Sequence, residues 1–211
     1  MKKIWLGIGV LVIVALTIVL IVTQTKKEPE VIKIGAIFPL TGDNAQWGIL
    51  PYEGAKLAIE EINKEGGLKG KKLVLVAEDS RCEPKEGVSA FQKLLAQNIK
   101  IVIGGVCISV TLAAAPIAEK NKILLISPAS TNPKIFESGD FIFRVIPSDA
   151  LRGKVSAKYL FGKGIKKVAL LYINNEGGVG NKNVFAKRFT DLGGRILVEG
   201  SYEQGATDMR T

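Results

Sequence analysis

The stretch from Ile99 to Ser127, IKIVIGGVCISVTLAAAPIAEKNKILLIS, holds the pattern that decides the fold class. It begins with an apolar run that ends in a double glycine, and it closes with a second apolar run, ILLIS. Between them, small and apolar residues follow one another from Ser109 to Lys120, which is long enough for a helix. Short apolar runs bounded by turn residues are typical of buried strands, so the stretch predicts a β–α–β unit.

The same alternation of apolar runs and helical patterns continues on both sides of this stretch. Further strands are predicted at residues 31–38, 72–79, 141–149, 166–173 and 195–200, and further helices at 52–62, 84–97, 150–161 and 181–192. Such a succession is typical of an α/β protein with parallel sheets flanked by helices.

The alternation restarts near residue 146, which divides the chain into two lobes. We expect a first lobe at residues 31–146 and a partial second lobe at residues 147–211. Only two full α/β units follow the restart, and a lobe with so few strands exposes a sheet edge that proteins normally protect. We therefore expect the second lobe to be incomplete in this sequence.

Residues 1–30 differ from the rest of the chain in composition. Nineteen uncharged residues run from Ile4 to Val22, which at about 1.5 Å per residue suffices to cross a hydrocarbon core of about 30 Å. This run predicts an uncleaved N-terminal transmembrane helix followed by a linker, and the alternative is a long signal peptide that is cleaved. Either interpretation places the remaining chain outside the cytoplasm.

Charge and composition argue against several classes of function. The formal net charge is +9, of which residues 1–30 contribute four lysines and two glutamates, and the other lysines are scattered. Without an arginine-rich or aromatic-interleaved stripe, nucleic acid is not an expected partner. The sequence has no histidine and no G-x-S-x-G motif, so we expect no enzyme, no catalytic residue and no cofactor. The segment EGGVGNKN at 176–183 lacks the G-K-[ST] ending of a phosphate loop and is interpreted as a turn before a helix.

The two cysteines, Cys82 and Cys107, both fall at predicted turns between a strand and a helix. In an oxidising compartment such a pair commonly forms a disulfide, and the alternative is two unpaired buried thiols. Two cysteines without histidine are too few ligands for a metal site, so none is expected.

Candidate ligand-binding groups lie at the turns that follow the strands, because ligands of open α/β sheets bind beyond the carboxyl ends of the strands. Helix N-termini there offer free N–H groups to a small anion, and Ser109, Thr111, Ser130 and Thr131 can add hydroxyls. Each hydroxyl could instead serve as a helix cap or stabilise a turn. Trp47, placed in the loop after the first strand, either forms a wall of the cleft or packs under its loop.

These segments together resemble a known family. From Ile32 to about Asp208 the chain is similar to the periplasmic binding proteins of the leucine/isoleucine/valine-binding type. The motifs that carry the resemblance are IKIGAIFPLTGDNAQWG, GAKLAIEEINKEGGLKGKKLVLVAEDSRCEPKEGV, IVIGGVC and LLISPASTNP. The resemblance implies a two-lobed type I periplasmic-binding-protein fold that closes over a small ligand. It also implies a disulfide between Cys82 and Cys107.

The resemblance assigns ligand-binding roles to the two turns and to the first loop. The ligand's carboxylate and ammonium would be held by Ile108 and Ser109 and by the turn Ala129, Ser130 and Thr131, with Trp47 covering its side chain.

Three positions depart from the family pattern. Ile108 stands where relatives usually have a hydroxyl residue, and Gly177 stands where they tend to have a tyrosine. The acidic residue that pairs with the ammonium in relatives would lie beyond Thr211.

The resemblance implies the extracytoplasmic solute-binding component of an ABC transporter. Its ligand would be a small amino acid, branched-chain or similar, or an amide, and its partner an ABC permease. The N-terminal helix would hold the binding domain at the cell membrane. The alternative is a membrane-anchored ligand-sensing domain of a signalling receptor.

Overall fold

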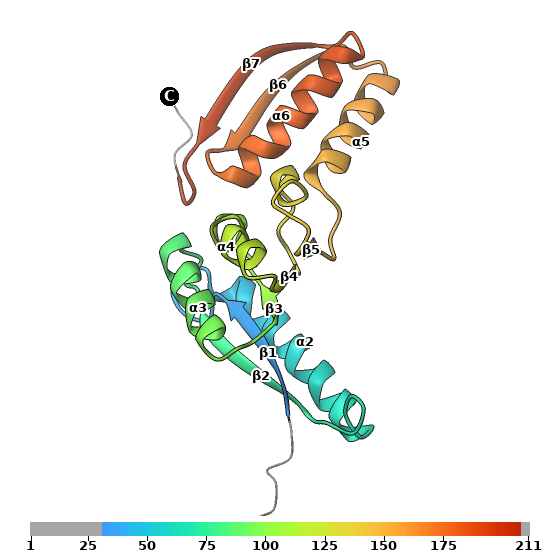
Figure 1. The fold of residues 1–211 in the computed structure, drawn as a ribbon. Helices are drawn as coiled ribbons and strands as arrows, with labels where there is room; N and C mark the ends of the chain where they lie inside the picture. The colour runs from blue at the N-terminus through green and yellow to red at the C-terminus, as the bar shows by residue number, and fades with distance from the viewer. Residues whose placement is uncertain (1–30, 208–211) are drawn as a thin grey trace, which may run out of the picture.

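Residues 31–207 are described by the computed structural model shown in Figure 1, and they form two separate parallel sheets. The first sheet has the strand order β2-β1-β3-β4-β5. Its strands are β1 (Ile32–Phe38), β2 (Leu73–Asp79), β3 (Ile101–Gly104), β4 (Leu124–Ser127) and β5 (Ile142–Arg144). The second sheet pairs β6 (Lys167–Ile173) with β7 (Arg195–Tyr202). The predicted α/β class, with parallel strands flanked by helices, is confirmed.

The predicted membrane helix at residues 4–22 lies outside the described residues. Within residues 31–207 no helix is both long enough and apolar enough to cross a membrane.

Three helices cover the first sheet, and they lie on opposite faces of it (Figure 1). Helices α3 (Pro84–Ala96) and α4 (Ile108–Lys120) pack side by side on one face, and α2 (Ala45–Lys64) contacts β1 and β2 from the other. The sheet grows from β1 in both directions, and right-handed crossovers in opposite directions place their helices on opposite faces. The carboxyl ends of the strands therefore meet the N-termini of the helices along one edge.

The main hydrophobic core lies between the first sheet and the pair α3 and α4. Phe91 and Leu94 from α3 are fully buried there beside Val102 of β3. Gly35 in the central strand makes room for this packing, because a Cβ at that position would lie 2.7 Å from Leu94 Cδ1. The next odd position, Ile37, belongs to the same core, as the alternation of side chains along a strand requires.

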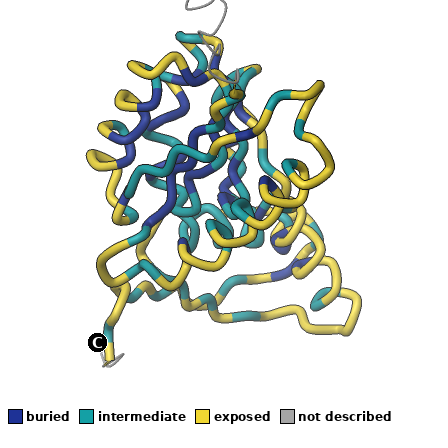
Figure 2. The backbone as a smooth tube through the Cα atoms, turned by 90° about the horizontal axis from the view of Figure 1, so that it is seen from below, coloured by how far each residue is buried: buried dark blue, intermediate teal, exposed yellow. Residues whose placement is uncertain are grey.

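The second lobe is thinner. Helices α5 (Asp149–Gly162) and α6 (Glu176–Asp191) pack on each other and cover one face of β6 and β7. Phe189 of α6 is fully buried, with its ring stacked on Phe185. No residue of β6 or β7 is fully buried, and both strands are drawn as exposed or intermediate in Figure 2. Large apolar side chains remain exposed on these strands: Leu171, Leu197 and Val198.

The junction between the lobes is tied to the turn after β4. The carboxylate of Asp149, at the start of α5, is buried and accepts a hydrogen bond of 2.8 Å from the hydroxyl of Thr131. Its other oxygen lies 2.6 Å from a guanidinium nitrogen of Arg152. The backbone N–H of Asp149 also donates to the carbonyl of Thr131 at 2.8 Å. The second lobe is thus connected to the first by side chain and backbone together.

Two helices begin earlier than the sequence predicts. Helix α2 begins at Ala45 rather than Tyr52 and contains Pro51 in its second turn, so that proline does not mark a helix start. Helix α6 begins at Glu176 rather than near residue 181, with its glycines inside the first turns. The side chain of Asn175 caps α6 by accepting a hydrogen bond from Gly178 N at 2.9 Å, which offsets the poor helix propensity of the glycines.

Candidate ligand-binding site

A cleft of about 690 Å³ lies where the strand ends of the first sheet face the start of α6. Its first-lobe wall comes from the start of α2 and from the turns after β2, β3 and β4, and its second-lobe wall from the start of α6 and the turn after β7. The residues that line it are Asn44, Trp47, Cys82, Val106, Cys107, Ile108, Ser109, Ala129, Asn175, Glu176, Gly177 and Gln204.

The N-terminus of α4 supplies free hydrogen-bond donors to this cleft. Cys107 is the N-cap residue, and the first backbone bond at this end runs from Thr111 N to Cys107 O at 3.1 Å. The N–H groups of Ile108 and Ser109, both in the first turn, have no acceptor within the helix. Together with the helix dipole they favour a carboxylate or another small anion.

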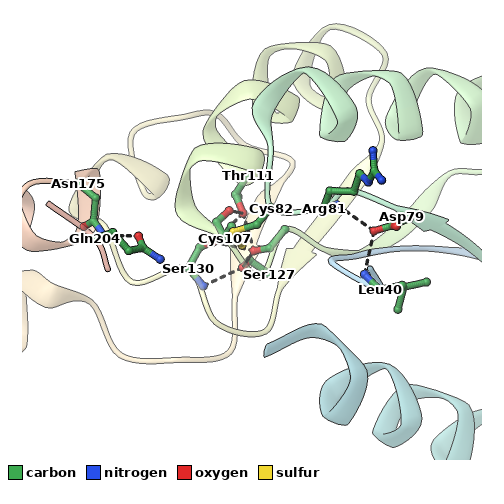
Figure 3. The surroundings of a disulfide bond; sticks show 11 residues. Leu40, Asp79, Arg81, Cys82, Cys107, Thr111, Ser127, Ser130, Asn175 and Gln204 are labelled. Carbon is green, nitrogen blue, oxygen red and sulfur yellow. Dashed lines mark hydrogen bonds between the residues drawn. A yellow bond between two sulfur atoms is a disulfide. The ribbon is translucent and has the colours of Figure 1, made fainter. Parts of the chain in front are cut away.

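The turn after β3 and the turn after β4 are joined through a single carbonyl group. The carbonyl oxygen of Gly105 lies 2.6 Å from Thr111 Oγ1, 2.7 Å from Ser127 Oγ and 2.7 Å from Ser130 Oγ (Figure 3). All three hydroxyl residues are fully buried, and the hydroxyls of Thr111 and Ser130 are 2.6 Å apart. Gly105 has a φ of +69°, and a Cβ there would collide with Thr111 Oγ1. These hydroxyls hold the two turns together rather than facing the cleft.

Asp79, the last residue of β2, organises the loop that leads into the helix of Trp47 and the turn that carries Cys82. Its carboxylate accepts hydrogen bonds from Leu40 N at 2.8 Å and Arg81 N at 2.9 Å (Figure 3), and from the hydroxyl of Thr41. Burial raises the pKa of this carboxyl, but the hydrogen bonds from Thr41, Arg81 and Leu40 outweigh burial and hold the pKa below its ordinary value of 3.8.

The disulfide between Cys82 and Cys107 is confirmed. It joins the turn after β2 to the N-cap of α4, and the two Cα atoms are 5.5 Å apart. Because the bond closes a loop of 25 residues, the chain-entropy model gives it a stabilisation of about 3 kcal/mol. Both half-cystines also line the cleft, so the bond fixes part of its wall.

Trp47 lies in the first turns of α2 and forms part of the cleft wall, with 64% of its surface exposed. It therefore does not pack under a loop. An indole this exposed beside a cleft offers a flat apolar surface to a ligand.

The second-lobe wall is held against the first lobe by Asn132. Its side-chain amide donates a hydrogen bond of 2.9 Å to the carbonyl of Glu176 in the first turn of α6. The approach is close: a Cβ at Gly177 would lie 3.1 Å from Ile108 Cδ1, and one at Gly180 would lie 3.1 Å from the Asn132 amide nitrogen. The glycines of α6 thus allow the N-termini of α4 and α6 to meet.

The structure brings together four of the six residues to which the family resemblance assigns ligand-binding roles. Trp47, Ile108, Ser109 and Ala129 line one cleft. Ser130 and Thr131 do not line it, because their hydroxyls bond inside the protein, to the carbonyl of Gly105 and to the carboxylate of Asp149.

Sequence reasoning missed the polar residues that complete the wall: Asn44, Asn175, Glu176 and Gln204. The asparagine before the glycine-rich start of α6 was a signal for one of them, because asparagine is a preferred N-cap residue. Asn175 and Gln204 are linked by a hydrogen bond of 3.3 Å across the end of the second sheet (Figure 3).

Comparisons with known proteins agree with this architecture. A family model described as "Periplasmic binding protein" matches residues 31–211. The leucine-specific-binding protein of Salmonella typhimurium is 36% identical over 171 residues, which cover 80% of this chain and 46% of the relative. The leucine-, isoleucine-, valine-, threonine-, and alanine-binding protein of Pseudomonas aeruginosa is 35% identical over 85% of this chain and 48% of the relative.

Solved structures show the same likeness. A leucine binding protein from Thermotoga maritima superposes with a TM-score of 0.75 at 32% identity, covering 84% of this chain and 51% of that one. The branched-chain amino acid binding protein LivJ of Streptococcus pneumoniae, solved in complex with isoleucine, gives 0.74 at 32% identity over 86% and 52%.

The chain belongs to the periplasmic binding protein family, since the family model spans residues 31–211. The fold is the α/β type I periplasmic-binding fold, with parallel sheets flanked by helices. The chain spans about half the length of the curated relatives it matches.

Proposed function

We propose that this chain belongs to the extracytoplasmic solute-binding component of an ABC transporter, and that its cleft takes a small amino acid, branched-chain or similar, or an amide. The observation that carries the proposal is the cleft itself, where free N–H groups of α4 lie beside the apolar surfaces of Trp47, Ile108 and Ala129. Relatives named for leucine, isoleucine and valine support this choice of ligand. The Streptococcus pneumoniae protein is the substrate binding protein of a branched-chain amino acid transporter, which favours transport over the sensing alternative.

The cleft suggests a different role for each of the candidate residues. Ile108 and Ser109 would receive the carboxylate at the N-terminus of α4, and Trp47 would cover the ligand's side chain. Ala129 would contact the ligand from the neighbouring turn. Ser130 and Thr131 would act by holding that turn in place, since their hydroxyls are already engaged.

The proposal extends to the lobes and to the membrane. Residues 31–146 and 147–211 would move as separate bodies that close on the ligand, because closure makes contacts that the open state lacks. Residues 4–22 would anchor the binding domain outside the cytoplasm, where an ABC permease would receive the ligand. The family is one of binding proteins, and we propose no catalytic step.

Isothermal titration calorimetry of the purified full chain with leucine, isoleucine, valine, small amides and urea tests the proposal. We expect heat of binding with at least one branched-chain amino acid. Trp47→Ala should weaken that binding about tenfold because it removes the cleft's aromatic wall. Leu50→Ala is the matched control, since Leu50 is on the same helix, is 77% exposed and does not line the cleft. Absence of heat with every ligand would contradict the proposal.

A further inference from the structure

Positive charge is concentrated in one segment of the second lobe, although lysines occur along the whole chain. Residues 150–190 contain nine lysines and arginines and a single acidic residue, Glu176. Residues 31–149 are nearly balanced, with fourteen basic and thirteen acidic residues. The basic segment forms α5, β6 and most of α6, and the two helices lie side by side on one face of the second sheet (Figure 1). Most of the excess charge is therefore carried by the helical face of this lobe.

A groove of about 710 Å³ runs between α5 and α6 on this face. Four cationic side chains line it: Lys154 and Lys158 from α5, and Lys187 and Arg188 from α6. Its one acidic residue, Asp191, already pairs with Lys187 at 2.9 Å. The other three cations have no carboxylate partner among residues 31–207. The rest of the lining is apolar, so the groove combines an apolar floor with uncompensated positive charge.

A row of exposed apolar side chains runs along α5 next to these lysines. Leu151, Val155 and Tyr159 are spaced four residues apart and therefore lie on one face of the helix. Each is more than half exposed, and Val155 also lines the groove. Single exposed apolar residues are ordinary, but a continuous row beside a groove is typical of an interaction surface. A partner of this surface has to cover apolar groups and neutralise lysines together.

Three kinds of partner can be compared with this surface. A second copy of the chain would bring the same positive groove and would be repelled. An anionic membrane has the right charge but is flat, whereas the groove is concave, so lipid headgroups would contact its rim and leave its floor uncovered. An amphipathic helix with acidic flanks fits both features, because its apolar side chains can enter the groove while its carboxylates reach the lysines.

We propose that the groove between α5 and α6 is a docking site for an acidic, amphipathic helix of another protein. The site goes beyond the proposed function, since it shares no lining residue with the ligand-binding cleft. A helix bound in the groove leaves the residues of that cleft free. Because the attraction is partly between exposed charges, the affinity falls as the ionic strength rises.

Fluorescence anisotropy of a labelled synthetic peptide mixed with the full chain tests the proposal. The peptide is a helix of about 18 residues with leucine at every third or fourth position and glutamate on both flanks. We expect saturable binding at about 0.01 M salt that weakens at about 1 M, because the screening length falls from about 30 Å to about 3 Å. A peptide of the same composition, scrambled so that it has no apolar face, should bind at least about tenfold more weakly, because it cannot cover the apolar floor.

Charge reversal in the groove gives the second arm of the test. Lys154→Glu combined with Lys158→Glu should weaken peptide binding at least about tenfold, because two attractions become repulsions. Lys154→Gln combined with Lys158→Gln should have a smaller effect in the same direction. Lys64→Glu combined with Lys85→Glu is the matched control, because it changes the net charge equally at exposed helix positions outside the groove. Circular dichroism of each variant shows whether it is folded.

Four results would overturn the proposal. They are no binding of the peptide by the wild-type chain, equal binding of the scrambled peptide, equal binding by the groove variant, and an equal loss in the matched control. The membrane alternative is tested with the full chain in phosphatidylcholine vesicles, with and without phosphatidylglycerol. Hydrogen-exchange protection of residues 149–162 that depends on phosphatidylglycerol, in the absence of peptide, would assign the surface to lipid and also overturn the proposal. Calorimetry with leucine is a separate measurement, so either proposal can fail without the other.

Discussion

The five-stranded and two-stranded sheets are built from the same β–α unit, yet they differ in how much of themselves they bury. In the first lobe, side chains from α3, α4 and four strands form one continuous core. In the second, Phe189 and Ala157 are the fully buried apolar side chains among the described residues, and one sheet face shows Leu171 and Leu197 to solvent. The first lobe can hold its half of the cleft rigidly, whereas the second depends on contacts such as Asn132 to Glu176 for its position.

The largest effect is expected from truncating one buried phenylalanine in each lobe, which tests whether the two cores are independent. Phe91→Ala in the first lobe and Phe189→Ala in the second should each lower the free energy of unfolding of their own lobe by about 3–5 kcal/mol, because both side chains are fully buried. Because α6 contributes little to the first core, Phe189→Ala should lower hydrogen-exchange protection in residues 149–202 and leave 32–144 protected. Phe91→Ala should lower protection in the first lobe. Equal loss everywhere in both variants would show that the lobes unfold as one unit.

The second largest effect on stability is expected from the disulfide, and it should be confined to the first lobe. Replacing both Cys82 and Cys107 by serine should lower the free energy of unfolding by about 3 kcal/mol, because it releases a loop of 25 residues in the unfolded chain. Urea denaturation followed by circular dichroism measures this loss. The oxidised wild-type chain and the same chain treated with reductant provide the control. A reduced wild type as stable as the oxidised one would contradict the expectation.

A smaller effect is expected for the carboxylate that organises the first-lobe loops. Asp79→Asn should lower the free energy of unfolding by about 1–2 kcal/mol at neutral pH. The substitution weakens the charge-assisted hydrogen bonds that the carboxylate accepts from Leu40, Thr41 and Arg81. The folded-state pKa lies below 3.8, so the unfolded chain takes up the proton first as pH falls. The stabilisation is therefore complete above about pH 4 and is lost as pH falls through the lower, folded-state value.

Denaturant titrations between pH 2.5 and 7 check this dependence. The difference in free energy of unfolding between wild type and Asp79→Asn should shrink as the solution becomes more acidic. A difference that stays constant over this range would show that the charge of Asp79 has no part in stability.

The smallest expected effect concerns a pair of helical glycines. Gly54 of α2 has open space around its Cα, so Gly54→Ala should stabilise the first lobe by about 1 kcal/mol through helix propensity. Gly177→Ala should increase the stability by less than Gly54→Ala does, because the new Cβ would lie 3.1 Å from Ile108 Cδ1. Thermal unfolding of both variants, with and without Ile108→Ala, measures the difference. If Ile108→Ala leaves the Gly177→Ala effect unchanged, the two lobes do not touch at this point in solution.

The strands and the fold class were predictable because buried parallel strands are short apolar runs between turn residues, as in residues 101–104 and 124–127. Helix starts were less predictable. Pro51 and the glycines after Glu176 usually mark breaks in a helix, yet both lie inside helices here. For the glycines, the cap by Asn175 and the close approach to the first lobe override local propensity.

The candidate site was predictable only as a location. The rule that ligands bind beyond strand ends indicated Trp47 and Ser109, and the family resemblance added Ile108 and Ala129. All four line one cleft. The sequence could not distinguish a hydroxyl that faces solvent from one that bonds a buried carbonyl or carboxylate far away in the chain. Ser130 and Thr131 therefore resembled Ser109, although their partners, Gly105 and Asp149, are set by tertiary packing.

The convergence of three hydroxyls on Gly105 has a consequence for how this cleft can evolve. The groups that maintain the shape of the turns are different residues from those whose side chains face the cavity. Substitutions at Trp47, Ile108 or Ala129 can alter what the cavity accepts without breaking any of these buried bonds. Single substitutions in the cleft wall therefore leave the buried framework of the two turns intact.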